Sequence, residues 1–337
     1  MFPFIRCKFL ALDRFRHLRT PDFSDLTLKI CLLRIINSQT TINHWRSLSP
    51  QTHRFAFAVA VLSLAFSKSL YGLLQLALNT DLHSHIILVP VVCIYFAWIK
   101  KDELPAASKP REALAIAPGL AAAALLVYYW AAGNFEAAED ALALTTLAYA
   151  LLIITAALFL YGPSLLKKQH FSLWFLIFLV PMPLIVQDWV NTFFQYASAE
   201  VSYQMVKSAN IPIFRPHPLT FELSTIQIRV APSCSGIRSS LVLLITSIVA
   251  GELFLQSKLK RWLLVFFIIP LAVVRNGFRI FTISYLCVHV GPHMIDHWIH
   301  HKGGPFFFGL SLIPFFVLLY WLWKKEPKKK PLAAIED

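Results

Sequence analysis

The chain has 337 residues, of which 57% are hydrophobic and 15% are charged, and its formal net charge is +13. The apolar residues fall in long blocks, unlike the short periodic runs of a soluble core, so the sequence predicts an all-α integral membrane protein and excludes a soluble globular one. The lysines and arginines lie mostly at the ends of these blocks, where membrane topology explains them, and we expect no nucleic-acid binding.

In chain order, residues 1–53 come first and are polar and basic. They lack the charged-then-apolar order of a signal peptide, which predicts a cytoplasmic tail. A polytopic membrane domain is predicted over residues 54–325, and a second cytoplasmic tail over residues 326–337. Crossing a bilayer takes roughly 20 helical residues, and the domain contains about eight candidate transmembrane helices. They are residues 55–78, 83–99, 113–132, 141–162, 171–190, 239–256, 262–288 and 305–323.

The loop charges orient these eight predicted spans. Every second connection carries lysine or arginine, whereas residues 79–82 and 133–140 carry neither. Because basic loops remain on the cytoplasmic side, we expect both termini in the cytoplasm and the external loop 191–236 on the opposite side.

A short β-hairpin is predicted within the external loop. Residues 220–223 and 226–230 alternate apolar and polar side chains, as two short strands do. Such a hairpin would lie on the outer surface just before Cys234. It would either offer a free strand edge to an extended peptide or merely cap the helices.

Three groups of polar residues converge on the predicted outer face. Cys234 stands just before the sixth span. Arg279 lies roughly 26 Å along the seventh span, with Arg275 and Asn276 one turn below it. An arginine within a span is costly and usually marks function, although it can also snorkel or form a structural pair. The third group is a histidine-rich segment before the last span, His289, His293, Asp296, His297, His300 and His301.

Cysteine, histidine and arginine together predict covalent catalysis on a peptide. A thiolate is a potent nucleophile, and a nearby imidazolium or guanidinium favours its formation. Histidine can donate a proton to a leaving amine, and arginine can hold a developing oxyanion. Among the other cysteines, only Cys287 is expected on the side of Cys234. A structural disulfide between the two is therefore the alternative to a catalytic thiol.

Three motifs in this order resemble the exosortase/archaeosortase family. They are Cys234-Ser235-Gly236-Ile237-Arg238, Asn276-Gly277-Phe278-Arg279, and His300 followed by Gly304. The resemblance covers roughly residues 55–325 and implies Cys234 as nucleophile, Arg279 as its arginine and His300 as its histidine. The neighbouring His301 is the alternative, because the doubled glycine of this chain allows a one-residue slip.

The resemblance also implies a location in a bacterial inner membrane, in contact with its lipids and with the active site facing the periplasm, and it implies a substrate class. The expected partners are secreted proteins that carry a C-terminal sorting signal of the PEP-CTERM kind, with a motif such as Pro-Glu-Pro, one transmembrane helix and a basic end. Arg238, Arg275 and Asn276 are the candidate substrate-binding residues. The acceptor is left open between an amine and water, and no cofactor or metal is implied.

Two other classes of function remain alternatives. A histidine-rich metal-binding protein or metalloenzyme would use His289, His293 and His297, which repeat every four residues, although Gly291 and Pro292 interrupt that repeat. An anion transporter would use Arg275 and Arg279 along its path. The enzyme requires the thiol of Cys234, the metal protein requires the histidines, and the transporter requires the arginines without the cysteine.

Overall fold

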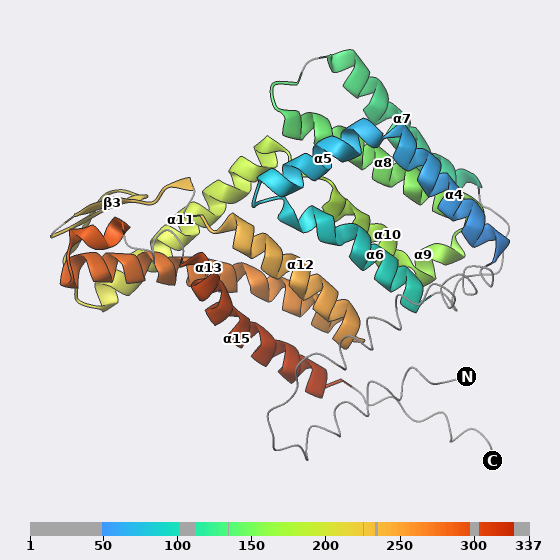
Figure 1. Ribbon diagram of the computed structural model, residues 1–337. Coiled ribbons are helices and arrows are strands. Elements are labelled where there is room, and N and C mark those ends of the chain that lie inside the picture. The colour runs from blue at the N-terminus through green and yellow to red at the C-terminus, as the bar shows by residue number, and fades with distance from the viewer. Residues whose placement is uncertain are drawn as a thin grey trace, which may run out of the picture. The chain divides into compact units, whose positions relative to one another are not determined.

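The computed structural model (Figure 1) describes residues 49–100, 112–133, 135–224, 226–232, 235–296 and 303–326. Contacts divide the chain into two units, Met1–Arg54 and Phe55–Asp337. The second unit holds the elements considered below, apart from residues 50–54 at the start of the first helix. Most of the two predicted tails, 1–53 and 326–337, lies outside the described residues.

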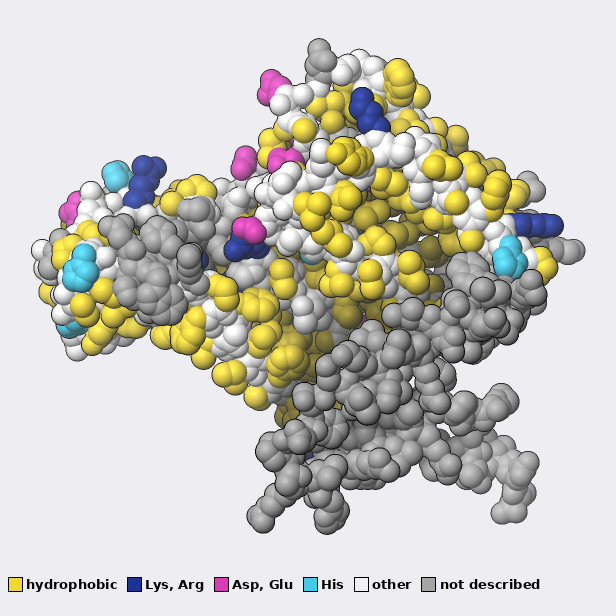
Figure 2. All heavy atoms as spheres, viewed as in Figure 1, with side chains coloured by type: hydrophobic (Ala, Val, Ile, Leu, Met, Phe, Trp, Pro, Cys, Tyr) yellow, Lys and Arg dark blue, Asp and Glu magenta, His cyan; other side chains and the backbone are white. Residues whose placement is uncertain are grey.

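Helices make up most of the described chain. Five of them are long and apolar enough to cross a membrane. These five are α7 (Glu112–Ala132), α8 (Ala138–Tyr161), α12 (Ile237–Phe254), α13 (Lys258–His289) and α15 (Gly304–Lys324). Figure 2 shows hydrophobic side chains over much of the visible surface of the described residues, as lipid contact requires. The chain is therefore an all-α integral membrane protein, as predicted.

Two helical pairs raise the number of candidate spans to seven if each pair is one span. The first pair is α4 (Pro50–Ala65) with α5 (Ser67–Asn79), bent by 78°. The second joins α10 (His170–Phe175) and the 3-10 helix η4 (Leu176–Leu179) to α11 (Leu184–Ser208), bent by 91°. The remaining predicted span, 83–99, consists of η2 (Ser84–Ile87) and α6 (Leu88–Ile99) and is shorter than the spanning helices.

The sharp bend before α11 corrects one expectation. Residues 171–190 are not one straight span, because Pro181 and Pro183 interrupt the chain between η4 and α11. Proline lacks the amide hydrogen that a helix needs and disfavours helical geometry in the preceding residue. Beyond the bend, α11 continues to Ser208, so the first part of the segment 191–236 is helical.

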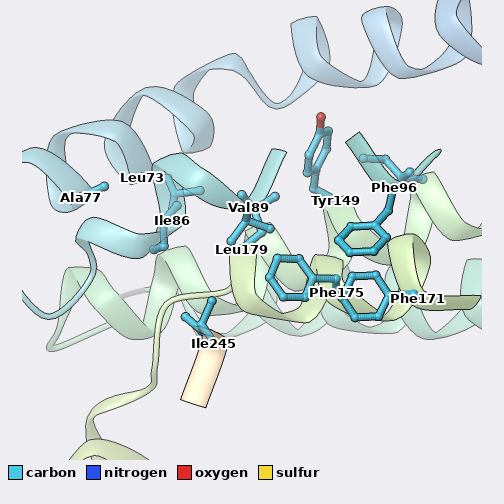
Figure 3. Close-up of a cluster of buried hydrophobic side chains, with 11 residues drawn as sticks. Leu73, Ala77, Ile86, Val89, Phe96, Tyr149, Phe171, Phe175, Leu179 and Ile245 are labelled. Atoms are coloured by element: carbon cyan, nitrogen blue, oxygen red, sulfur yellow. The ribbon is translucent and has the colours of Figure 1, made fainter. Parts of the chain in front are cut away.

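A buried aromatic cluster joins the first half of the domain to α12. Figure 3 shows Phe96 of α6 facing Phe171 and Phe175 of α10. The ring centroids of Phe96 and Phe171 are 4.3 Å apart, and those of Phe171 and Phe175 are 5.3 Å apart. Ile245 of α12 reaches the same cluster. Burial of these side chains therefore fixes α12 against the preceding helices.

Charged side chains gather at one end of the helices, where α6, α12 and α15 end and α13 begins. Glu252 accepts hydrogen bonds from Lys100, at 2.8 Å, and from Arg261. Lys260 donates to the backbone carbonyl of Lys325 at 2.7 Å, and Glu326 accepts from the backbone amide of Gln256. The short helix α9 (Ser164–Lys168) lies just before Gln169, whose amide donates to the carbonyl of Lys100 at 3.1 Å. The basic connections of the sequence thus meet at one end of the helices.

A three-stranded sheet packs against α11 and the second half of α13. It contains β1 (Ile213–His217), β2 (Thr220–Leu223) and β3 (Gln227–Arg229), antiparallel in the order β1-β2-β3. Thr220 pairs with Arg229 in register, and Phe221 points inward with Val230 against α11 and α13. The strands β2 and β3 fall within the two alternating stretches. The strand β1 was not predicted, because Pro216 interrupts its pattern and lies where its register is irregular.

The loop charges lead to a topology prediction. A reporter fused after Gln256, between α12 and α13, is expected to report the cytoplasm. A reporter fused after Asn210, between α11 and β1, is expected to report the opposite side. Paired phosphatase and green fluorescent protein fusions at both positions would measure this, because each reporter is active on only one side. The reverse pair of signals would invert the whole topology.

Candidate functional site

The predicted nucleophile and both candidate histidines, Cys234, His300 and His301, lie outside the described residues. The chain is described from Ser235 onward, up to Pro292–Asp296 (η6), and again from Gly303. The candidate site is therefore built from the residues that flank these three positions and from the predicted arginines.

Helix α12 begins at Ile237, three residues after Cys234, and its first turn packs closely against α13. Gly236 has φ +73°, in the left-handed region that glycine tolerates best. A Cβ atom at this position would lie 2.9 Å from Asn276 Oδ1 and 3.1 Å from Arg275 Nη2. Both the backbone conformation and the close approach of α13 therefore require glycine in the Cys-Ser-Gly motif.

Arg275 connects α13 to this first turn. Its side chain is 7% exposed, and its Nη2 atom donates to the carbonyl of Gly236 and to Ser240 Oγ, both at 3.2 Å. Its Nη1 atom is buried and has no hydrogen-bond partner among the described residues. Arg275 is one of the predicted substrate-binding residues. The geometry gives it a contact with the residues that follow Cys234.

Asn276 and Arg279 share the site side of α13 with Arg275. Asn276 is 2% exposed and faces Gly236, and Arg279 is half-buried one turn beyond Arg275. Gly277 faces α11 instead, where an added Cβ would lie 2.7 Å from Val201 Cγ1. The Asn-Gly-x-Arg motif thus places Asn276 toward α12 and lets α11 and α13 approach each other.

Two residues of α11 form hydrogen bonds with described residues of the Cys234 segment, by which we mean residues 230–235. Neither was predicted from the sequence as a site residue. Asn191 Oδ1 accepts a hydrogen bond from Ser235 Oγ at 2.7 Å, and Gln195 Nε2 donates to the backbone carbonyl of Val230. Both are amides about one helical turn apart on α11. That spacing was the available signal, but it does not tell which distant backbone atoms the amides bind.

Arg238 lies at the outer edge of this region. It forms an ion pair with Asp81, which follows α5, and both side chains are largely exposed. A carboxylate of this chain therefore already occupies the guanidinium that was predicted to bind substrate. An exposed pair of this kind is worth about 0–1 kcal/mol, so a substrate carboxylate could displace it at small cost.

The histidine repeat does not continue along one helix. α13 ends at His289, Gly291 adopts φ +142°, and His293 belongs to η6. The described part of the chain contains no group of three or more His, Cys, Asp or Glu side chains placed to hold a metal ion, while His297, His300 and His301 lie outside it. Cys287, the partner in the alternative disulfide, is fully buried in α13.

Comparison with family models matches residues 77–317 to the family described as transmembrane exosortase (Exosortase_EpsH). The matched range covers more than half of the chain and includes Cys234, Arg279 and His300. No curated protein and no solved structure matches this chain.

Proposed function

Because this chain belongs to the transmembrane exosortase family, we propose that it is a cysteine peptidase or transpeptidase that acts through a thioacyl intermediate on Cys234. Family membership gives the chain a general role as a membrane transpeptidase or protease with protein substrates that carry C-terminal signals. To this general role we add the residues that act, the covalent step, and the side of the membrane on which the reaction takes place.

In the proposed reaction, the Cys234 thiolate attacks the carbonyl carbon of the scissile peptide bond. The carbon–nitrogen bond then breaks, and the leaving amine takes a proton from His300, with His301 as the alternative donor. The products are the released C-terminal signal and a thioester on Cys234. An acceptor amine or water attacks this thioester and returns the sulfur as thiolate, while the histidine takes up the proton that the attacking group loses.

The observation that carries the proposal is the contact of Arg275 with Gly236, two residues after Cys234. It holds the guanidinium of α13 against the segment that carries the nucleophile, and Arg279 follows one turn away. Guanidinium groups and the start of α12 both favour a thiolate over a thiol and an oxyanion over a carbonyl. We therefore assign Arg279 to electrostatic support of the tetrahedral intermediate.

The proposed substrate is a secreted protein still held in a bacterial inner membrane by a PEP-CTERM-like signal. Its motif would reach Cys234 on the periplasmic side, where Arg238, Arg275 and Asn276 are the candidate contacts. Two features support this assignment. The described basic residues Lys100, Lys260 and Arg261 gather at the end of α12 opposite Arg238, and the guanidinium of Arg238 is exposed in a pair that a substrate carboxylate can replace.

Trapping the thioacyl intermediate tests the proposal. The protein is co-expressed with a tethered substrate, acid-quenched, and digested for mass spectrometry. We expect the substrate's new C-terminus to be attached to the peptide that contains Cys234, and hydroxylamine to release it, because thioesters are sensitive to this amine. An adduct on another residue, or cleavage without any adduct in quenched samples taken during turnover, would contradict the covalent mechanism.

A further inference from the structure

Two amide side chains on one face of α11 bracket the segment that carries Cys234. Asn191 Oδ1 accepts from Ser235 Oγ at 2.7 Å, and Ser235 immediately follows Cys234. Gln195 Nε2 donates to the carbonyl of Val230, four residues before Cys234. One contact therefore lies on each side of the cysteine, and the two come from successive turns of α11.

The Gln195 contact is shielded from water, and the Asn191 contact is partly shielded. Gln195 is 8% exposed, Val230 is 2% exposed and Ser235 is 1% exposed, whereas Asn191 is half-buried. Where little solvent competes, a polar group left unpaired is costly. Ser235 Oγ also accepts from the backbone amide of Ile237 at 3.4 Å. The contact with Asn191 is thus continuous with the first turn of α12.

The same helix is held against α13, which carries the arginines. Val201 and Ser198 of α11 lie against Gly277, where an added Cβ would be 2.7 Å from Val201 Cγ1 and 3.2 Å from the Ser198 carbonyl. α11 therefore contacts both the Cys234 segment and the helix of Arg275 and Arg279. A side chain on α11 that fixes the segment also fixes its distance from α13.

We propose that Asn191 and Gln195 are positioning residues: they hold Ser235 and Val230, which flank Cys234 in the chain, on α11, and the reactivity of the Cys234 thiol depends on these two contacts. This inference rests on the proposed function for the identity of the nucleophile. Neither amide touches substrate in this scheme. Each acts through one contact, Asn191 through the hydroxyl of Ser235 and Gln195 through the carbonyl of Val230.

The test uses the full-length membrane protein with Cys234 as its single cysteine. Asn191→Leu and Gln195→Met remove one contact each at similar volume. The matched control is Gln204→Leu, because Gln204 is an exposed amide on α11 that bonds Glu200, away from the Cys234 segment. Two quantities are measured, the rate of Cys234 alkylation by iodoacetamide at neutral pH and the rate of substrate processing at saturating substrate.

Both variants are expected to lose about 10²-fold in processing rate, the scale on which a misplacement of about 1 Å acts, with little change in apparent KM. Alkylation should slow by about threefold or more, because the released segment no longer holds the thiol beside the positive groups that favour the thiolate. Gln204→Leu should resemble the parent in both measurements.

A double-mutant cycle separates positioning from general loss of structure. If Asn191 acts through Ser235, then Asn191→Leu should have no further effect on alkylation in a Ser235→Ala background. Parent-like alkylation in both single variants, or additive effects in the cycle, would overturn the inference. If alkylation changes as expected but the parent itself processes no substrate, the proposed function fails while the positioning of Cys234 stands.

Discussion

Cys234→Ser is expected to abolish removal of the C-terminal signal from a co-expressed tethered substrate. Loss of a nucleophile lowers turnover on the order of 10⁴-fold or more in other covalent proteases. Serine preserves the size of the side chain, but its hydroxyl does not ionise near neutral pH as a thiol does. The measurement is the fraction of substrate with its signal removed, at equal levels of folded enzyme in the membrane.

The matched control is Cys93→Ser. Cys93 is half-buried on α6 and donates to the carbonyl of Ser172 at 3.4 Å, in the aromatic-cluster region of the domain. Its replacement should leave processing unchanged, which would show that the effect at position 234 is not a general consequence of removing a cysteine. Full processing by the Cys234→Ser protein would contradict the thiol mechanism and restore the histidines or the arginines as the primary groups.

The same assay ranks the two adjacent histidines. Loss of a general acid or base costs about 10²–10⁴-fold, and we expect this loss in His300→Ala and a much smaller one in His301→Ala. The opposite order would move the role by one position along the chain. Equal, small losses in both variants would remove histidine from the proton-transfer step.

Length and hydropathy were enough to predict a helical membrane protein, because each crossing needs a long apolar block wherever the block packs. Alternation was likewise enough to predict β2 and β3, since Phe221 and Ile228 face the helices while their neighbours face outward. The bend before α11 was missed although Pro181 and Pro183 are local signals. The apolar block 171–190 is long enough to predict one span, and its two prolines are the only local indication of the bend.

The contacts within the candidate site could not be predicted from the sequence in the same way. Asn191 lies 44 residues before Ser235, and Gln195 lies 35 residues before Val230. Nothing local in an amide side chain indicates which distant group it will bind. Arg275 illustrates the same limit. Its place within a span predicted a functional role, but only the fold shows that Gly236 and Ser240 receive its hydrogen bonds.

The two arginines of α13 are expected to respond differently to replacement. Arg275→Met removes two buried hydrogen bonds from a charged donor, to Gly236 and Ser240. It should lower stability by about 2 kcal/mol and also lower processing, because the start of α12 is released. Arg279→Lys keeps the charge but not the planar fork, so it should cost about 10²-fold in processing with a smaller change in unfolding temperature.

A third arginine distinguishes chemistry from lost stability. Arg261 pairs with Glu252 at the end of the helices that carries the basic connections, so Arg261→Met should destabilise the protein by a comparable amount because it leaves a buried carboxylate without that partner. Unfolding followed by tryptophan fluorescence in detergent gives the stability, and the processing assay gives the activity. If Arg261→Met and Arg275→Met lose processing equally, Arg275 affects the reaction only through stability. If the two variants have the same unfolding temperature but Arg275→Met loses far more processing, the contact of Arg275 with Gly236 positions the segment of Cys234 for catalysis. The two variants then differ only in which end of the helices has lost its contacts.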